Sequence, residues 1–138
     1  IPENQGYNFA GKTVLLVEDD EINSEIARNL LSRRGLLVDT AENGRVALSK
    51  FMMNAPGTYG LILMDVRMPL MDGLEATRRI RASGKSDAKR IPIVAVTANA
   101  YEKDEQCSME AGMDAHLTKP VETGVLYETV QRALDGDL

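Results

Sequence analysis

A short apolar run that ends in a carboxylate, Leu61-Ile62-Leu63-Met64-Asp65, constrains the fold of this chain more than any other feature. Tyr59-Gly60 precedes the run and Pro69 follows it, which predicts a buried strand between turns. Strands that are buried on both faces are typical of parallel sheets covered by helices. Because such sheets place their chemistry beyond the carboxyl ends of the strands, Asp65 is the first candidate for a functional residue.

Apolar strand patterns and helical patterns alternate along the whole chain. We expect strands at residues 14–17, 36–38, 61–65, 91–96 and 115–118. Each strand is followed by a helical pattern: one begins near Glu21, one follows Asn43-Gly44, one follows Asp72-Gly73, one covers roughly Tyr101 to Ala111, and the last carries Val125 to Leu134. Five strands that alternate with five helices predict an α/β fold with a parallel sheet and helices on both faces.

Two of these helices carry patterns that can be checked directly. Ile22, Ile26 and Leu30 recur every fourth residue and predict one apolar face on the first helix. In the third helix, Ala76 and Ile80 belong to the inward face, and the arginines Arg78, Arg79 and Arg81 are expected to point outward.

Composition limits the class of partner. The chain has 138 residues, with 16 Lys and Arg against 21 Asp and Glu, for a formal net charge of −5. This length predicts one domain with its own core: we assign residues 1–11 to a linker and 12–138 to the domain. The acidic balance argues against a nucleic acid or an anionic membrane as partner.

Cysteine usage and hydropathy favour a cytoplasmic domain. Cys107 is the only cysteine, as expected for a reducing compartment. No apolar run approaches the ~20 residues that span a bilayer, and residues 1–5 do not have the pattern of a signal peptide.

One motif match is rejected on its context. Residues 6–13, Gly6-Tyr7-Asn8-Phe9-Ala10-Gly11-Lys12-Thr13, fit the phosphate-loop pattern of nucleotide-binding proteins. That loop needs a strand before it and a helix after it, so that helix N–H groups face the phosphates. Here a polar segment precedes the match and a strand follows it, so we do not expect a nucleotide site.

Polar side chains follow four of the five expected strands and predict a site at one edge of the sheet. They are Glu18-Asp19, Asp65, Thr97 and Lys119. Crowded carboxylates favour a divalent cation, and hard oxygen ligands favour Mg²⁺. A carboxylate can attack phosphorus to give an acyl phosphate, and Asp65 is the natural nucleophile. Lys119 and the Thr97 hydroxyl would then stabilise charge on the transferred group.

These residues resemble a known family, the receiver domains of two-component response regulators. The resemblance covers roughly Lys12 to Leu134, and four segments carry it: Val17-Glu18-Asp19-Asp20, the segment Met64 to Gly73, Val96 to Ala100, and Thr118-Lys119-Pro120. It implies a flavodoxin-like (βα)5 doubly wound sheet with strand order 2-1-3-4-5. Residues 8–12, which lead into the first strand, the helix start Glu21-Ile22-Asn23 and the segment Thr97 to Ala100 also resemble the receivers of hybrid sensor histidine kinases. The resemblance therefore implies that the domain could be the cytoplasmic part of a membrane-bound sensor kinase.

The resemblance also implies roles for individual residues. Asp65 would accept a phosphoryl group from phosphohistidine. Asp19, Asp65 and the backbone carbonyl of Arg67 would ligate Mg²⁺, with Glu18 acting mainly through water. Thr97 and His116 would act as switch residues, and the Lys119–Pro120 bond would be cis. The implied partners are the phosphohistidine domain of a histidine kinase or a histidine phosphotransfer protein, and a weak homodimer is compatible with the resemblance.

Rival functions depend on a few positions. A phosphatase of the haloacid-dehalogenase type needs a second acid two residues after the nucleophile, where this chain has Arg67. A phosphate-independent binding module remains the alternative, although such domains usually lose residues that this chain keeps. As an enzyme, the domain would catalyse only the phosphorylation and dephosphorylation of its own Asp65, while a parent protein could be a histidine kinase.

Overall fold

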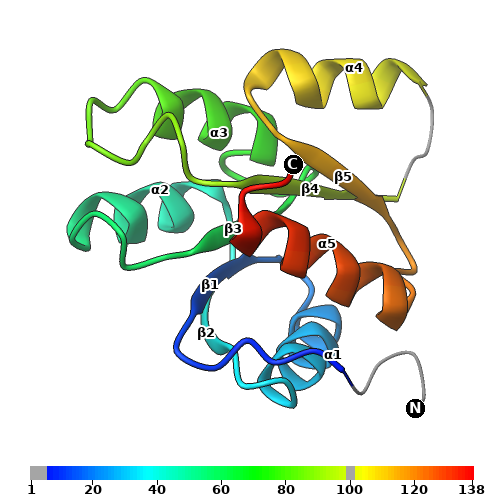
Figure 1. Ribbon diagram of the computed structural model, residues 1–138. Coiled ribbons are helices and arrows are strands. Elements are labelled where there is room, and N and C mark those ends of the chain that lie inside the picture. The colour runs from blue at the N-terminus through cyan, green and yellow to red at the C-terminus, as the bar shows by residue number, and fades with distance from the viewer. Residues whose placement is uncertain (1–5, 99–101) are drawn as a thin grey trace.

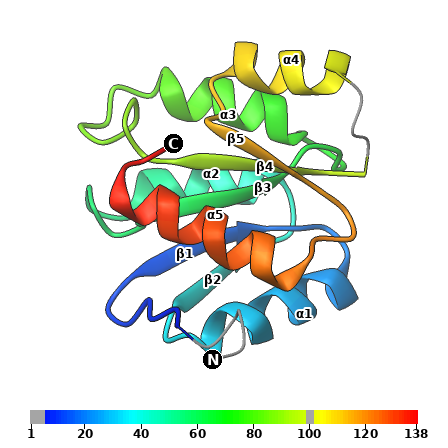
Figure 2. The same cartoon turned by 45° about the vertical axis from the view of Figure 1, so that its right-hand side comes forward.

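The computed structural model describes residues 6–98 and 102–138 and contains one five-stranded parallel sheet within them. The strands are β1 (Thr13–Val17), β2 (Leu37–Ala41), β3 (Leu61–Asp65), β4 (Ile93–Thr97) and β5 (Ala115–Thr118). Their order is β2-β1-β3-β4-β5, with β2 and β5 at the edges (Figure 2). This is the flavodoxin-like doubly wound arrangement that was predicted, with the chain order reversing next to β1.

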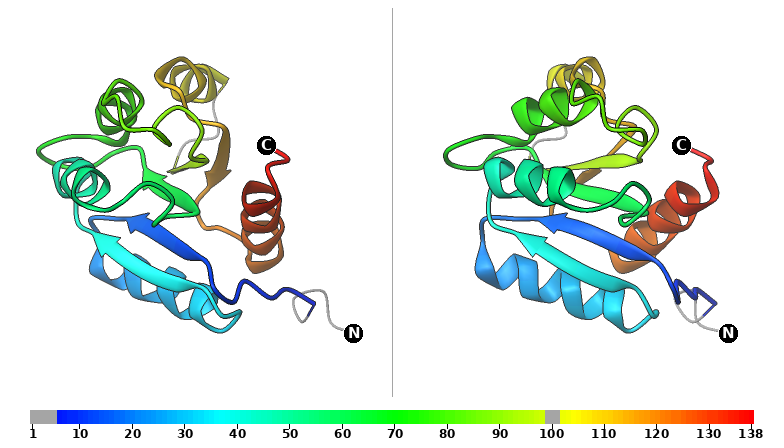
Figure 3. Two further views of the ribbon diagram at one scale, coloured as in Figure 1. Left: turned by 60° about the vertical axis from the view of Figure 1, so that its left-hand side comes forward. Right: turned by 90° about the vertical axis from the view of Figure 1, so that its left-hand side faces the viewer.

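A helix follows each strand. The helices are α1 (Glu21–Ser32), α2 (Gly44–Met53), α3 (Gly73–Arg81), α4 (Glu102–Ala111) and α5 (Thr123–Asp135). The helices α1 and α5 cover one face of the sheet, and α2, α3 and α4 lie on the other side (Figures 1 and 3). Each of the first three helices begins at a side-chain cap, in which Asp20, Asn43 or Asp72 accepts a hydrogen bond from a backbone N–H three residues on.

Alternating side chains of the central strands supply two separate cores. Leu15, Ile62 and Ile93 point into the core under α2 and α3, which also contains Phe51 and Ile80. Their neighbours point to the opposite core, under α1 and α5, whose buried members include Val14, Leu63, Val94, Leu117, Leu126 and Val130. Because both faces of β3 are covered, all five of its residues are buried, as the apolar run predicted.

The segment before β1 packs on the core under α1 and α5. Phe9 is only 1% exposed, and its backbone N–H donates to the Arg34 carbonyl at 2.7 Å. The Phe9 ring lies 6.1 Å from the ring of Tyr127 on α5, and Tyr7 packs beside both. Within the segment assigned to a linker, the two aromatic side chains therefore pack on the domain, while Asn8, Ala10 and Gly11 are exposed.

One expectation about a helix face is corrected, and the apolar face of α1 is as predicted but only partly buried. The side chain of Arg81 does not point outward: its guanidinium donates to the carbonyls of Ala88, Gly112 and Ile91 and pairs with Asp114 at 2.9 Å. These loop carbonyls need donors, and periodicity cannot reveal them. The apolar face of α1 is only partly buried, since Leu31 is covered whereas Ile22 and Ile26 are 72% and 54% exposed.

Candidate functional site

Four candidate functional residues lie together where the carboxyl ends of the parallel strands meet. Glu18 directly follows β1, Asp65 is the last residue of β3, Thr97 is the last residue of β4, and Lys119 directly follows β5. The backbone is hydrogen-bonded through these positions: Lys119 N–H donates to the Thr97 carbonyl at 2.7 Å, and Glu18 N–H donates to the Ala41 carbonyl at 3.0 Å. The structure therefore brings the four residues together, and backbone hydrogen bonds between neighbouring segments fix their positions.

The loop between β3 and α3 is packed directly against the backbone of Asp65. Gly73 N–H donates to the Val66 carbonyl at 2.9 Å, which closes the loop. A Cβ atom on Gly73 would overlap the Asp65 carbonyl oxygen, so only glycine permits this approach. Leu70 in the same loop has a φ of +66° and is 76% exposed, a left-handed conformation that is uncommon for leucine.

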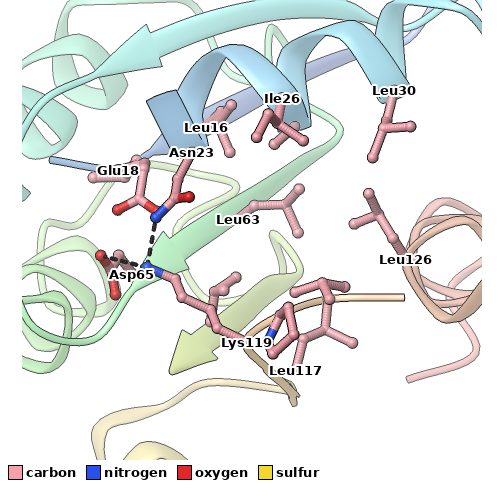
Figure 4. Close-up of a pocket in the computed structure, with 15 residues that line it drawn as sticks. Leu16, Glu18, Asn23, Ile26, Leu30, Leu63, Asp65, Leu117, Lys119 and Leu126 are labelled. Carbon is pink, nitrogen blue, oxygen red and sulfur yellow. Dashed lines mark hydrogen bonds and ion pairs between the residues drawn. The ribbon is translucent and has the colours of Figure 1, made fainter. Parts of the chain in front are cut away.

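Lys119 joins two carboxylates at the centre of the site. Its Nζ lies 2.8 Å from Glu18 Oε1 and 3.1 Å from Asp65 Oδ2 (Figure 4). The side chains of Glu18 and Asp65 are only 7% and 8% exposed, whereas that of Lys119 is 26% exposed. One ammonium group therefore serves two buried acids, and the cluster keeps an excess of negative charge.

The pKa values reflect this excess. Burial raises the pKa of Asp65 to about 7, helped by the neighbouring Glu18 and opposed by Lys119. Burial would also raise the pKa of Glu18, but hydrogen bonds with Asp65 and Lys119 outweigh it, so that this pKa is lowered. Burial would lower the pKa of Lys119, yet the two carboxylates raise it. Glu18 and Lys119 are therefore the charged pair, and Asp65 is the acid whose charge is incompletely compensated.

The donor set fits a hard divalent cation. Carboxylate oxygens of Glu18, Asp19 and Asp65 all lie within 4.8 Å of one another. Within the described part of the chain, Glu18 Oε2 is a buried oxygen that has no hydrogen-bond partner. Clustered carboxylate oxygens with an unsatisfied acceptor match the preference of Mg²⁺ for oxygen ligands. Asp20, the next acid along the chain, is instead engaged as the cap of α1.

The remaining predicted residues lie around this cluster. Thr97 is 3% exposed at the end of β4, and Arg67 is exposed two residues after Asp65. His116 is half-buried on β5, where it pairs in register with Ala95. The peptide bond between Lys119 and Pro120 is cis. Asn99 and Ala100, which belong to one of the segments that carry the resemblance, lie outside the described residues.

An apolar cavity that no sequence pattern predicted opens beside the cluster. Its lining includes the site residues Glu18, Asp65 and Lys119 together with Asn23 and Ile26 of α1 (Figure 4). The spacing of Ile26 and Leu30 predicts their place on one face of the first helix, but no local pattern shows that α1 leaves space between its side chains and the sheet.

Comparison with known proteins identifies the family of signalling domains to which this fold and its strand-end acids belong. The family model of the response regulator receiver domain matches residues 14–131. The chain therefore belongs to the receiver domain family of two-component signalling.

Curated relatives include both long kinases and a short regulator. The chain is 37% identical to hybrid signal transduction histidine kinase I of Dictyostelium discoideum, over 93% of this chain and 8% of the kinase. It is 39% identical to probable histidine kinase 2 of Oryza sativa subsp. indica, over 91% of this chain and 13% of that protein. A two-component response regulator of Oryza sativa subsp. japonica is 46% identical, over 78% of this chain and 83% of the regulator. The chain thus spans about a tenth of the length of the kinases it matches.

Two solved structures have the same fold as this chain. The receiver domain of a sensor histidine kinase from Pseudomonas aeruginosa, with a magnesium ion coordinated in its active site cleft, has a TM-score of 0.82 and 36% identity, covering 91% of this chain and 99% of that one. A chemotaxis protein of the CheY type from Vibrio cholerae also has a TM-score of 0.82, with 31% identity, covering 91% and 100%. Among the described residues, no helix combines the length and apolar character needed to cross a bilayer.

Proposed function

We propose that this receiver domain is a phosphoacceptor in a phosphorelay, with Asp65 as the acceptor and Mg²⁺ as the cofactor. The observation that carries the proposal is the cluster of Glu18, Asp65 and Lys119, in which two buried carboxylates share one ammonium group at 2.8 and 3.1 Å. A structural ion pair would balance its charges, whereas this cluster still has the capacity to hold a cation. The magnesium ion of the Pseudomonas aeruginosa receiver supports the same choice of metal.

In the transfer step, a carboxylate oxygen of Asp65 attacks the phosphorus of a partner's phosphohistidine. The O–P bond forms as the P–N bond breaks, and the released imidazole keeps the electron pair and takes up a proton. Lys119, already 3.1 Å from Asp65, is positioned to balance charge on the phosphoryl oxygens. Glu18, Asp19, Asp65 and the Arg67 carbonyl would hold Mg²⁺, which supplies further charge stabilisation when bound.

Phosphorylation would change the charge and hydrogen bonding at the ends of β4 and β5. The phosphoryl group adds negative charge and acceptor oxygens beside Asp65. Thr97 ends β4, and Lys119 is tied to the Thr97 carbonyl through its backbone N–H. We therefore assign the switch to Thr97 and to the surface formed by β4, α4 and β5, with His116 on β5 as the second switch residue.

The partner would be a histidine phosphotransfer protein or the phosphohistidine domain of a kinase. Ile22 and Ile26 of α1 are exposed beside the acidic site and offer an apolar surface for such a partner. The similarity to histidine kinases supports the origin of this domain in a hybrid sensor kinase. The domain would then act in the cytoplasm.

The direct test is intact-mass spectrometry after incubation with acetyl phosphate, with and without Mg²⁺. We expect one phosphoryl adduct that requires Mg²⁺ and is missing from Asp65→Asn. The matched control is Asp39→Asn, which changes an acid on β2 outside the cluster and is expected to keep the adduct. The absence of an adduct even with a phosphohistidine donor would favour the phosphate-independent binding module.

A further inference from the structure

Basic side chains are concentrated in one short segment of this acidic chain. Residues 78–90 contain six of its 16 Lys and Arg residues and only one of its 21 Asp and Glu residues, Asp87. The segment therefore has a formal charge of +5, while the other ten basic and 20 acidic residues leave −10 on the rest of the chain. Because salt screens surface charges within ~8 Å at physiological ionic strength, a ligand at this segment would respond to the local charge.

The exposed cations of this segment lie at the end of α3 and in the loop before β4. They are Arg78, Arg79, Lys89 and Arg90. Arg78 and Arg79 both pair with the single acid Glu75, at 3.4 and 3.0 Å, and more than half of each arginine side chain stays exposed. Ion pairs this exposed are weak, so the guanidinium groups remain available to another anion.

An exposed apolar tip lies beside these cations. The acid of the segment, Asp87, accepts a hydrogen bond at 2.9 Å from the N–H of Gly57 in the loop after α2. The two loops therefore lie side by side, at the left-hand end of the molecule in Figure 1. The end of α2 exposes Met52 and Met53, at 45% and 82%, and residues 55–56, an alanine and a proline, are exposed after it.

The cations and the apolar tip are fixed to each other and lie far from the acidic site. Lys85 Nζ donates to the carbonyl of Phe51, in the last turn of α2, and lies 4.0 Å from the centre of the Phe51 ring. The two loops precede β3 and β4, so they lie at the amino ends of these strands, whereas Asp65 and Thr97 are at the carboxyl ends. A surface that binds here would therefore leave the acidic site open.

We propose that residues 52–56 and 78–90, the basic corner, form a docking surface for an anionic lipid bilayer. Met52 and Met53 would enter the interface, and the exposed Arg and Lys side chains would contact lipid phosphates. A projecting apolar tip flanked by cations suits a lipid surface, whereas peptides are mostly recognised in grooves or at sheet edges. The expectation drawn from the net charge of the chain does not apply to this corner, because the local charge has the opposite sign.

The test is co-sedimentation of the domain with phosphatidylcholine vesicles that contain or lack phosphatidylserine. We expect at least ~10-fold tighter binding to the anionic vesicles, and a loss of this preference at high salt. Equal binding to the two kinds of vesicle, or none at low salt, would overturn the proposal. Binding of polyglutamate or RNA by a domain that does not sediment with the anionic vesicles would overturn it in favour of a protein or nucleic-acid partner.

Matched pairs of exposed residues locate the docking surface. Replacing both Lys89 and Arg90 with Gln should weaken binding to anionic vesicles at least ~10-fold, because each cation near the surface contributes. Replacing both Arg28 and Arg33 with Gln removes the same charge from exposed positions on and after α1, and should leave binding unchanged. Met53→Ser should weaken binding without any change of charge. Equal losses for the two pairs would contradict the proposal, and since no phosphodonor is present, that result would leave the phosphoacceptor function untouched.

Discussion

Two clusters of lysine and carboxylate side chains lie at different places in this domain, and they differ in their balance of charge. At the acidic site, Lys119 serves both Glu18 and Asp65. Between β2 and α2, Lys50 at 2.8 Å and the Tyr59 hydroxyl at 2.6 Å both donate to the single acid Asp39. In the first cluster two carboxylates share one lysine, whereas in the second cluster two donor groups serve one carboxylate.

The pKa values of the two aspartates move in opposite directions. Burial and the nearby Glu18 raise the pKa of Asp65 to about 7. Burial would raise the pKa of Asp39 as well, but the hydrogen bonds from Lys50 and Tyr59 outweigh it and lower that pKa. A buried aspartate with enough hydrogen-bond donors, such as Asp39, therefore stabilises the fold. One with too few, such as Asp65, favours the binding of a cation.

The largest difference is expected from neutralising the two aspartates without metal. At pH 8 the buried charge of Asp65 destabilises the domain, so Asp65→Asn should raise the free energy of unfolding, by on the order of 4 kcal/mol for a pKa moved from 3.8 to about 7. The folded pKa lies above the unfolded value, so this penalty is present above pH 7 and is relieved as the pH falls toward 4. Urea unfolding at pH 8 and pH 5 measures both values, and an Asp65→Asn domain that is less stable at pH 8 would contradict the comparison.

Replacing each lysine separately should show which of the two clusters acts in phosphorylation. Lys119→Met is expected to slow phosphorylation by acetyl phosphate about 100-fold, because one donor to the phosphoryl oxygens is lost. Lys50→Met, the matched control, should phosphorylate at the rate of the unaltered domain, since Lys50 contacts Asp39 and the Thr40 carbonyl and no residue of the acidic site. Intact-mass time courses give both rates, and equal rates for the two variants would break the distinction.

The smallest effect is expected from Asp39→Asn. At pH 7 it should lower the free energy of unfolding by about 1 kcal/mol, since the Asp39 side chain is 40% exposed and its ion pair is screened by solvent. The folded pKa lies below the unfolded value, so the stabilisation is present above pH 4 and is lost as the pH falls through the folded value. Thermal unfolding of both proteins should therefore give curves that converge in acid; a gap that widens there would show that Asp39 acts through something other than its charge.

Local pattern and parallel-sheet topology were sufficient to predict most of the acidic site. Glu18, Asp65, Thr97 and Lys119 each follow or end an apolar run, and parallel strands bring their carboxyl ends to the same edge. No periodicity could show that one lysine contacts two of these acids, because the contact joins residues that are 101 and 54 positions apart.

The features that were not predicted depend on long-range packing. Arg81 has the spacing of an exposed arginine, but carbonyls of two distant loops draw its guanidinium inward. Phe9 lies among turn-forming residues, and it is buried because Tyr127, far along the chain, offers a ring to pack on. The cavity beside α1 likewise depends on how α1 and α5 pack against the sheet, which the pattern of a single helix does not encode.

We propose that the acidic site takes up a cation because it holds one carboxylate more than Lys119 can balance. The most direct measurement is a pH titration of the Asp65 side-chain carboxyl by carbon NMR, with and without Mg²⁺. We expect a midpoint near pH 7 without metal, in line with the raised pKa of Asp65, and a midpoint far lower with Mg²⁺, because the cation favours the charged carboxylate. An ordinary midpoint of about pH 4 that Mg²⁺ does not change would contradict this proposal.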